Sequence, residues 1–283
     1  MIDQSITIGI PTFNSELTIL ETINSLLNQS FKNWNCVISD DNSQDKTMDI
    51  ICEHVEGDSR FTFLKNYVNL GQSGNFNRIL NSASSEFFLL LCSDDVLYPS
   101  AIEDMMNDFS VSENISVVFG KRNMVNEVGR VLFRSKSTKD SQVINKQDAI
   151  IQVLKLASSP FAEPSFVVFR TNSLVKSGGY SNELKFIIDL DSYLKLLDHG
   201  LGVLHHSAVG NWRVRRSSDT FRLQKLVKTE MKCLIENLYD ISFKNKIGSL
   251  RFILIKLSIK TRFNYLLLNL LTWTYPKRNG EKK

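Results

Sequence analysis

Residues 89–99 read LLLCSDDVLYP, and this stretch decides the fold class. An apolar run that begins at Phe87 ends in two adjacent aspartates, Asp94 and Asp95, and a proline follows at Pro99. A short apolar run bounded by turn residues is typical of a buried strand. Two adjacent acids after such a strand form either a solvated turn that leads into a helix or a binding site. The neighbouring segments decide between these interpretations.

The order strand, loop, helix repeats before this stretch. Strands are predicted at residues 5–11, 35–39, 60–65 and 87–92, and helices at 16–28, 46–54 and 69–83. In the first helix Leu17, Leu20, Ile23 and Leu27 recur at helical spacing. Short strands alternating with helices predict an α/β fold with a mixed, mostly parallel sheet flanked by helices.

The second half of the chain has a less regular pattern. Strands are predicted at residues 115–120, 165–170 and 202–206, helices at 147–156 and 189–199, and a polar loop at 121–140. From about residue 223 onward the pattern is helical throughout. We therefore expect an α/β domain at residues 1–222 and a basic, apolar helical extension at residues 223–283.

Polar residues follow four of the predicted strands. They are Thr12 and Asn14, then residues 40–43, 66–71 and 93–95. In an open α/β sheet, ligands bind outside the carboxyl ends of the strands. Asp94 and Asp95 suit a hard divalent cation, which takes one or two carboxylates together with substrate phosphates. The sequence has no GxGxxG and no GxxxxGK[ST] pattern, which argues against a dinucleotide dehydrogenase or a P-loop NTPase.

The net charge of +4 over 283 residues is unevenly distributed. Residues 244–283 carry +9, and residues 1–243 carry −5. Because the excess positive charge is confined to the tail, we do not expect nucleic acid as a partner. The four cysteines form no CxxC pair, so neither a zinc site nor a disulfide framework is predicted. The N-terminal stretch lacks the layout of a signal peptide, which predicts a cytoplasmic protein.

Residues 250–283 mix basic, aromatic and aliphatic side chains. Lys256, Lys260 and Arg262 interrupt the apolar run, whereas a membrane span needs about 18 or more apolar residues. Two interpretations stay open. The segment is either an interfacial helix on anionic lipid, or a helix packed on the α/β domain, because Arg251 and Arg262 fall on a different side from the two lysines.

Six motifs occur in register along residues 5–200. They are IPTFNSE (10–16), VISDDNSQDKT (37–47), NLGQSGNFN (69–77), LLLCSDDVLYP (89–99), GGY (178–180) and DLDSYLKLL (189–197). Together they resemble the inverting nucleotide-sugar glycosyltransferases of family 2, which have the GT-A fold. The resemblance implies transfer of one sugar from a nucleotide donor to an acceptor hydroxyl.

The resemblance also implies roles for individual residues. Contacts with the nucleotide-sugar are implied for Pro11, Thr12, Asn14, Asp41, Asn69, Ser93, Asp94 and Arg215. Asp41 takes the position that accepts a hydrogen bond from a uracil-type base. Asp94 lies near the ribose, and Asp95, with Asp94 beside it, coordinates Mg²⁺ or Mn²⁺. The sequence departs from the family at Cys92, where a further acid is common.

Asp189 takes the position of the family's catalytic base. Its usual neighbouring Glu is replaced by Ile188, and an apolar neighbour raises the pKa of a carboxyl by desolvation, which suits a general base. Asp191 is interpreted as an acid of the helix N-terminus rather than a second base. Residues 211–220, NWRVRRSSDT, resemble a mobile loop near the diphosphate, which is why Arg215 is a candidate phosphate contact.

These expectations combine into one function. We expect a hexosyl- or N-acetylhexosaminyltransferase that uses a UDP-sugar in bacterial surface polysaccharide (O-antigen or capsule) biosynthesis. Its acceptor would be a glycan on polyprenyl diphosphate, and its location the inner face of the cell membrane. No QxxRW motif is present, which favours a single addition. The alternatives are transfer to polyprenyl phosphate, or a catalytically inactive GT-A-like scaffold that binds nucleotide.

Overall fold

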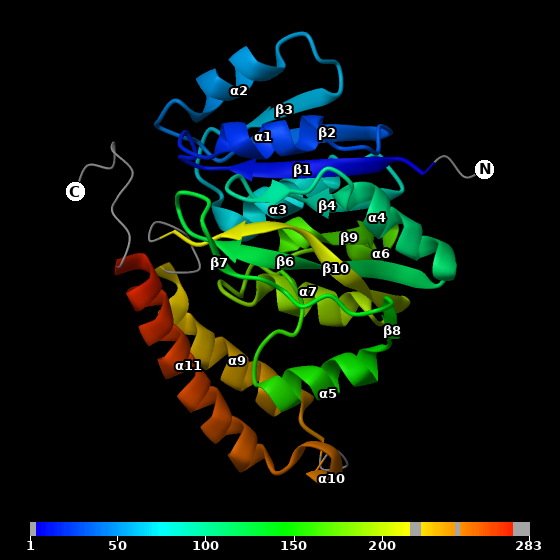
Figure 1. The fold of residues 1–283 in the computed structure, drawn as a ribbon, viewed down its shortest axis with the longest axis vertical. Helices are drawn as coiled ribbons and strands as arrows, with labels where there is room; N and C mark the ends of the chain where they lie inside the picture. Colours follow the sequence, from blue (N-terminus) through cyan, green and yellow to red (C-terminus); the bar gives the residue numbers. More distant parts are fainter. Residues whose placement is uncertain (1–3, 216–221, 241–243, 274–283) are drawn as a thin grey trace.

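The computed structural model describes residues 4–215, 222–240 and 244–273. Its centre is a sheet in the order β3-β2-β1-β4-β9-β6-β10-β5 (Figure 1). Four parallel neighbours open the chain: β1 (Ile6–Thr12), β2 (Trp34–Asp40), β3 (Phe61–Lys65) and β4 (Phe87–Leu90). The helices after these strands are α1 (Ile19–Leu27), α2 (Thr47–Val55), α3 (Gly71–Asn81) and α4 (Ala101–Asp108).

The rest of the sheet contains strands of both directions. β6 (Ile115–Val125) and β10 (Leu201–Arg213) pair in parallel, while β9 (Val167–Arg170) runs antiparallel between β4 and β6. Short strands complete it: β5 (Val96–Leu97), β7 (Val131–Phe133) and β8 (Gln142–Ile144). β1, β4, β6 and β10 therefore share one direction, and their carboxyl ends meet at one edge. This edge is called the carboxyl edge below.

Apolar residues of the sheet and its helices form the core. Ile6, Ile8 and Ile10 of β1 are completely buried. Gly9 lies where α3 approaches β1, because a Cβ atom there would sit 2.3 Å from Cγ2 of Ile79. The close approach of α3 therefore requires glycine at this position, and it seats the loop before α3 against the carboxyl edge.

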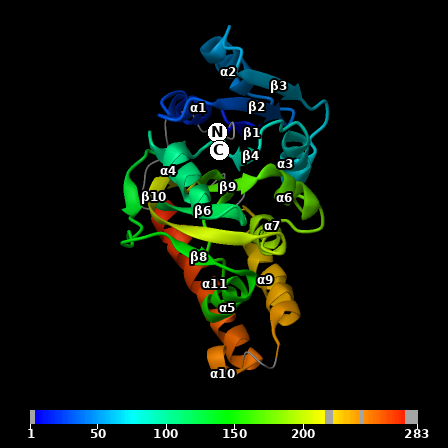
Figure 2. The ribbon, with the colours of Figure 1, turned by 90° about the vertical axis from the view of Figure 1, so that its right-hand side faces the viewer.

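Of the remaining helices, α6 and α7 lie beside the sheet in Figure 1, and α5, α9, α10 and α11 lie below it. They are α5 (Lys146–Leu156), α6 (Thr171–Lys176), α7 (Ile188–Leu196), α9 (Gln224–Leu238), α10 (Lys244–Ile247) and α11 (Leu250–Trp273). Figure 2 shows α5, α9 and α11 side by side. Met231 and Ile235 of α9 and Ile253 and Leu257 of α11 are buried in the same core as the sheet. The division at residue 222 stays a prediction, but one face of the extension packs on the α/β domain.

Several predicted strand bounds were wrong. The strand predicted at 115–120 continues to Val125, and the one at 202–206 begins at Leu201 and continues to Arg213. Residues 211–213 are thus part of β10 rather than of a loop, because they pair with residues 123–125 of β6. Residues 131–133, predicted as loop, form β7. Within the described residues, no helix is long and apolar enough to cross a membrane.

Candidate functional site

The ends of β1 and β2 are joined by side chains rather than by the sheet alone. Asp40 accepts hydrogen bonds from the hydroxyls of Thr12 (3.2 Å) and Ser43 (2.5 Å). Asn14 has a left-handed backbone with φ of 48°, which asparagine tolerates, and its side-chain oxygen accepts from the backbone N–H of Gln44 (2.8 Å). The structure therefore places Pro11, Thr12 and Asn14 at the carboxyl edge, with the hydroxyl of Thr12 committed to Asp40.

Asp41 holds the loop between β3 and α3. Its buried carboxylate accepts from the side-chain amide of Asn66 (2.8 Å) and from the backbone N–H groups of Leu70 (2.8 Å) and Gly71 (3.0 Å). The side-chain amide of Asn69 donates to the carbonyl of Asp41 at 3.2 Å. The structure thus brings Asp41 and Asn69 together. The geometry shows Asp41 positioning the loop, and its contact with a base stays a prediction.

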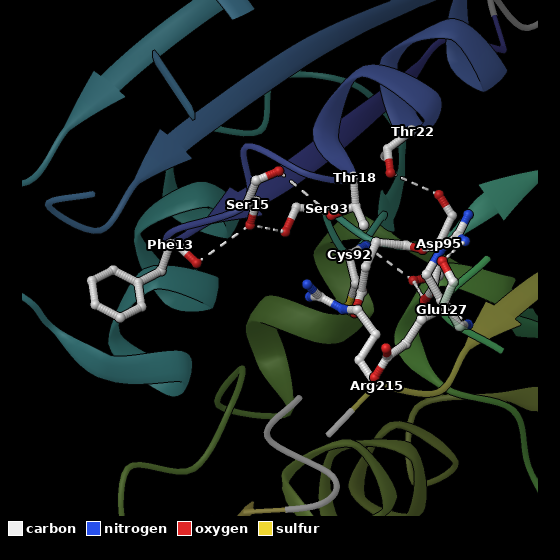
Figure 3. Close-up of polar contacts among 12 residues, drawn as sticks. Phe13, Ser15, Thr18, Thr22, Cys92, Ser93, Asp95, Glu127 and Arg215 are labelled. Atoms are coloured by element: carbon white, nitrogen blue, oxygen red, sulfur yellow. Dashed lines mark hydrogen bonds and ion pairs between the residues drawn. The ribbon is translucent and has the colours of Figure 1, made fainter. Parts of the chain in front are cut away.

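Asp95 lies at the bottom of the turn after β4. It is 1% exposed, and its carboxylate accepts from the hydroxyl of Ser165 (2.5 Å) and from the backbone N–H of Arg213 (3.0 Å). Its own carbonyl accepts from Thr22, as drawn in Figure 3. Burial, and then the negative charge of Asp94, raise the pKa of the Asp95 carboxyl well above its usual range. Burial therefore opposes a second negative charge in this turn.

Asp94 is more accessible than Asp95 and has a cationic partner. One oxygen of its half-buried carboxylate accepts from Nε (3.0 Å) and Nη2 (2.8 Å) of Arg215. Arg213 lies beside it, where its guanidinium binds the carbonyls of Asp94 and Glu127 and the carboxylate of Glu21. The fold therefore brings Arg215, the predicted phosphate-binding arginine, to the acidic pair. There its positive charge offsets the negative charge of the Asp94 carboxylate. Arg213, in the same sequence stretch as Arg215, is buried.

Ser93 connects the acidic turn to the loop after β1. Its hydroxyl lies 2.7 Å from the hydroxyl of Ser15, and Ser15 also donates to the carbonyl of Phe13 at 3.3 Å. Figure 3 shows these two serines facing each other next to Cys92. The carboxyl edge is thus continuous from Asn14 to Asp95.

Asp189 lies in the first turn of α7, and the charge of Glu163 acts on both Asp189 and Asp95. Its half-buried carboxylate accepts from the backbone N–H of Leu190 at 2.8 Å. Burial raises the pKa of Asp189 to about 7, the charge of Glu163 adds to the rise, and the Leu190 N–H and the charge of Arg122 oppose it. A carboxyl with this pKa exchanges protons near neutral pH.

Asp191 differs from Asp189 although it lies in the same turn. Its carboxylate pairs with Lys195 at 2.6 Å, one helical turn along α7. An acid in the first turn of a helix with an i,i+4 lysine stabilises the helix. This geometry agrees with the structural role predicted for Asp191.

One short segment that the motifs did not reveal links the two acidic centres. Ser165 holds Asp95 and also accepts from the backbone N–H of Cys92 (2.9 Å). Glu163 forms a two-pronged ion pair with Arg122, and the carbonyl of Ala162 accepts from Tyr193 of α7 at 3.2 Å. Because β9 is antiparallel, its beginning lies at the carboxyl edge. The sequence does show a polar Glu-Pro-Ser run before this apolar strand. It does not show the direction of the strand, which is what places the run at the carboxyl edge.

The acidic turn offers carboxylate oxygens to a divalent cation that is shared with a phosphate ligand. Among the described residues, no group of three or more His, Cys, Asp or Glu side chains is arranged to hold a metal ion. Mg²⁺ is commonly held by one or two carboxylates plus substrate phosphates, so a full protein cage is not required. Asp94 and Asp95 each keep acceptor lone pairs after the hydrogen bonds described, because a carboxylate has about four.

Comparison with curated proteins gives relatives whose names describe sugar transfer. The chain is 31% identical over 169 residues to the UDP-Glc:alpha-D-GlcNAc-diphosphoundecaprenol beta-1,3-glucosyltransferase WfgD of Escherichia coli, covering 58% of this chain and 66% of that protein. It is 30% identical over 177 residues to the GalNAc(5)-diNAcBac-PP-undecaprenol beta-1,3-glucosyltransferase of Campylobacter jejuni, covering 62% and 54%. The matches therefore span less than two thirds of either relative.

Solved structures confirm the predicted GT-A fold. Staphylococcus aureus TarS 1–349 in complex with UDP-GlcNAc superimposes with a TM-score of 0.69 at 21% identity, covering 92% of this chain and 73% of that one. The mannosyltransferase PcManGT from Pyrobaculum calidifontis, in complex with GDP-Man and Mn²⁺, gives a TM-score of 0.59 at 12% identity. At these identities the likeness concerns the fold alone.

The family model described as glycosyl transferase family 2 matches residues 7–177, which is more than half of the chain. This match includes the ends of β1 to β4, and it confirms the family indicated by the motifs. The chain belongs to glycosyl transferase family 2.

Proposed function

We propose that this chain transfers one sugar from a nucleotide donor to an acceptor hydroxyl, with inversion, during assembly of a surface glycan. The observation that carries the proposal is that one short segment, residues 162–165, contacts both the Asp95 turn and helix α7, which carries Asp189. The Asp94–Asp95 turn suits a metal-bound diphosphate, and Asp189 has a pKa of about 7. The two relatives named above support sugar transfer to a diphosphate-linked polyprenol.

The donor lies over the ends of β1 to β4 in this proposal. Its contacts are Pro11, Thr12, Asn14, Asp41, Asn69, Ser93, Asp94 and Arg215. The name of the Escherichia coli relative and the TarS complex support UDP as the nucleotide, and a hexose or N-acetylhexosamine as the sugar. The PcManGT complex holds GDP-Man, so guanosine diphosphate is the nucleotide to test against UDP.

Asp94 and Asp95 are the proposed ligands of Mg²⁺ or Mn²⁺. The cation, when bound, stabilises the negative charge of the departing nucleoside diphosphate. Asp94 offers the outer, half-buried carboxylate, and Ser165 and the backbone of Arg213 hold Asp95 behind it. Arg215 already places a guanidinium at Asp94, where it adds positive charge beside the phosphates.

Asp189 is the proposed general base. It accepts the proton of the acceptor hydroxyl while the hydroxyl oxygen bonds to the anomeric carbon. The bond from that carbon to the diphosphate oxygen breaks on the opposite face, so the configuration inverts in one step. A base with a pKa near the working pH combines a large deprotonated fraction with useful basicity.

The raised pKa of Asp189 also separates this proposal from its closest alternative. A polyprenyl phosphate acceptor would attack through an oxygen that is already ionised near neutral pH, and that reaction needs no protein base. A carboxyl whose pKa is raised to about 7 favours an acceptor that loses a proton. We therefore propose a glycan hydroxyl on polyprenyl diphosphate as the acceptor, reached from the cytoplasmic side by a peripherally attached protein.

The experiment compares Asp189→Asn with Asp191→Asn, a matched control two residues further along the same helix. Calorimetry measures donor binding, and release of nucleoside diphosphate measures turnover. Asp189→Asn should bind the donor as the wild type does and lose turnover, whereas Asp191→Asn should retain both. Unchanged turnover in Asp189→Asn would contradict the proposal and favour an inactive scaffold.

A further inference from the structure

Helix α11 carries an apolar stripe on the side that faces away from the protein. It comprises Phe252, Ile255, Ile259, Phe263 and Leu266, which are exposed by 62%, 50%, 65%, 62% and 67%. Their spacing of three or four residues places them on one face of the helix. We call this set the α11 stripe.

The opposite face of α11 is buried. Ile253 is 1% exposed and Leu257 is 2% exposed, and both belong to the core that α9 and the sheet share. Helix α11 is therefore packed on the protein through one face. The exposure of the α11 stripe does not result from loose attachment of the helix. The interpretation of this segment as a helix packed on the α/β domain is therefore correct for this face.

Basic residues border the α11 stripe on both sides. At 3.6 residues per turn, Arg251 and Arg262 fall along one border, and Lys256 and Lys260 fall along the other. Both lysines donate to neutral acceptors near the end of α5, Lys256 to the carbonyl of Lys155 and Lys260 to the hydroxyl of Ser158 (2.6 Å). Their charges are thus not neutralised by these contacts, and residues 244–273 contain no acid.

We propose that the α11 stripe binds an anionic membrane surface. A helix with an apolar face flanked by lysine and arginine lies in the plane of the interface, with its apolar side chains below the headgroups. Each basic residue near an anionic surface adds about 1 kcal/mol, a factor of about five. A second copy of the chain is a poorer occupant, because two stripes face to face would bring like charges together.

The orientation of α11 links this surface to the site. The C-terminal end of the helix lies at the same side of the molecule as the carboxyl ends of β1 and β10 (Figure 1). A protein held on the membrane through the α11 stripe would keep the carboxyl edge near the lipid surface. This link rests on the proposed function, because a polyprenyl-linked acceptor is itself embedded in that surface.

The test uses the full chain and phospholipid vesicles, either of phosphatidylcholine alone or containing phosphatidylglycerol. Co-sedimentation should show binding to the anionic vesicles and much weaker binding to the neutral ones. In the triple variant Ile255→Ser, Ile259→Ser, Phe263→Ser, vesicle binding should be weaker by about tenfold or more. Arg251→Gln with Arg262→Gln should weaken it by about 30-fold.

Matched controls separate the stripe from general surface hydrophobicity. Val111, Val143 and Val175 are exposed by 60%, 52% and 51% and lie outside α11, so their triple change to serine should leave vesicle binding unchanged. Donor binding in solution reports folding of every variant and tests the proposed function separately. It should be unchanged in the stripe variant, so loss of vesicle binding and failure of the donor site are distinguishable.

Three results would overturn the inference. The first is equal binding of the wild type and the stripe variant to anionic vesicles, and the second is no vesicle binding by the wild type. The third is a wild type that is dimeric by light scattering while the stripe variant is monomeric, which would identify a second copy of the chain as the occupant.

Discussion

The carboxyl edge and helix α11 meet their chemical requirements in opposite ways. At the edge, the carboxylates receive donors from the chain itself: Asp41 accepts three hydrogen bonds and Asp95 accepts two. On α11, five large apolar side chains are at least half exposed beside basic residues without acids. The edge is preorganised to hold a small polar ligand, and α11 is suited to an extended apolar and anionic surface.

The difference makes the two regions separable by experiment. Substitutions at the edge should change turnover with any acceptor, soluble or lipid-linked. Substitutions on the exposed face of α11 should change only events at a membrane. A substitution in one region that produced the other region's effect would show that the two regions do not act separately.

The largest effect is expected at Asp189. Asp189→Asn should lower turnover by about 10²- to 10⁴-fold, the usual contribution of general base catalysis. In the wild type, turnover should fall as pH falls through about 7, because the protonated carboxyl cannot accept a proton. A pH profile of kcat/KM from pH 5 to 9 measures this, and a flat profile would argue against a base with this pKa.

A smaller effect separates the two faces of α11. Leu257→Ala should lower the free energy of unfolding by about 2–5 kcal/mol, because it opens a cavity in the core. Ile259→Ala, two residues along, should change it by less than about 0.5 kcal/mol, since Ile259 is 65% exposed. Denaturant titration compares the pair, and equal losses would mean that the stripe is covered by protein.

Ser165 tests whether the segment before β9 supports the acidic turn. Ser165→Ala removes the donor to Asp95 and the acceptor of the Cys92 N–H, so it should lower the free energy of unfolding by about 1–3 kcal/mol. Metal-dependent nucleotide binding should weaken at the same time. Ser159→Ala, in the loop before this segment, is the control. Equal losses of stability and nucleotide binding in that variant would argue against a specific role of Ser165 in supporting the acidic turn.

The smallest effect is expected at Glu163. Its charge raises the pKa of Asp189, so Glu163→Gln should move the acid limb of the pH profile to lower pH by up to about one unit, which equals about 1.4 kcal/mol. Arg122 lowers the same pKa, so Arg122→Gln should move the limb to higher pH. Shifts in the same direction for both variants would show a structural rather than an electrostatic role.

Much of the first half could be predicted from the sequence, for a physical reason. Each apolar run there is short and is followed within a few residues by Asp or Asn, so the ends of β1 to β4 and their polar residues can be predicted locally. The direction of β9 is not local, because it depends on pairing with β4 and β6. Glu163 and Ser165 were missed for this reason, since they lie at the beginning of a strand rather than at its end.

Helix α11 shows a second limit. Its residues form two apolar faces, one around Leu257 and one around Ile259, and the sequence does not say which of them packs. The basic residues therefore looked scattered. Once the packed face is known, the same residues border the exposed one.

The central claim is that the carboxyl edge binds a nucleoside diphosphate through a metal at Asp94 and Asp95. Calorimetric titration of UDP, with GDP and dTDP for comparison, tests it on the wild type, on Asp94→Asn and on the control Asp191→Asn, each with and without Mn²⁺. UDP should bind to the wild type and to the control in a Mn²⁺-dependent way. This binding should be lost in Asp94→Asn. Binding of equal strength without Mn²⁺ or in Asp94→Asn, or no binding of any nucleotide, would contradict it.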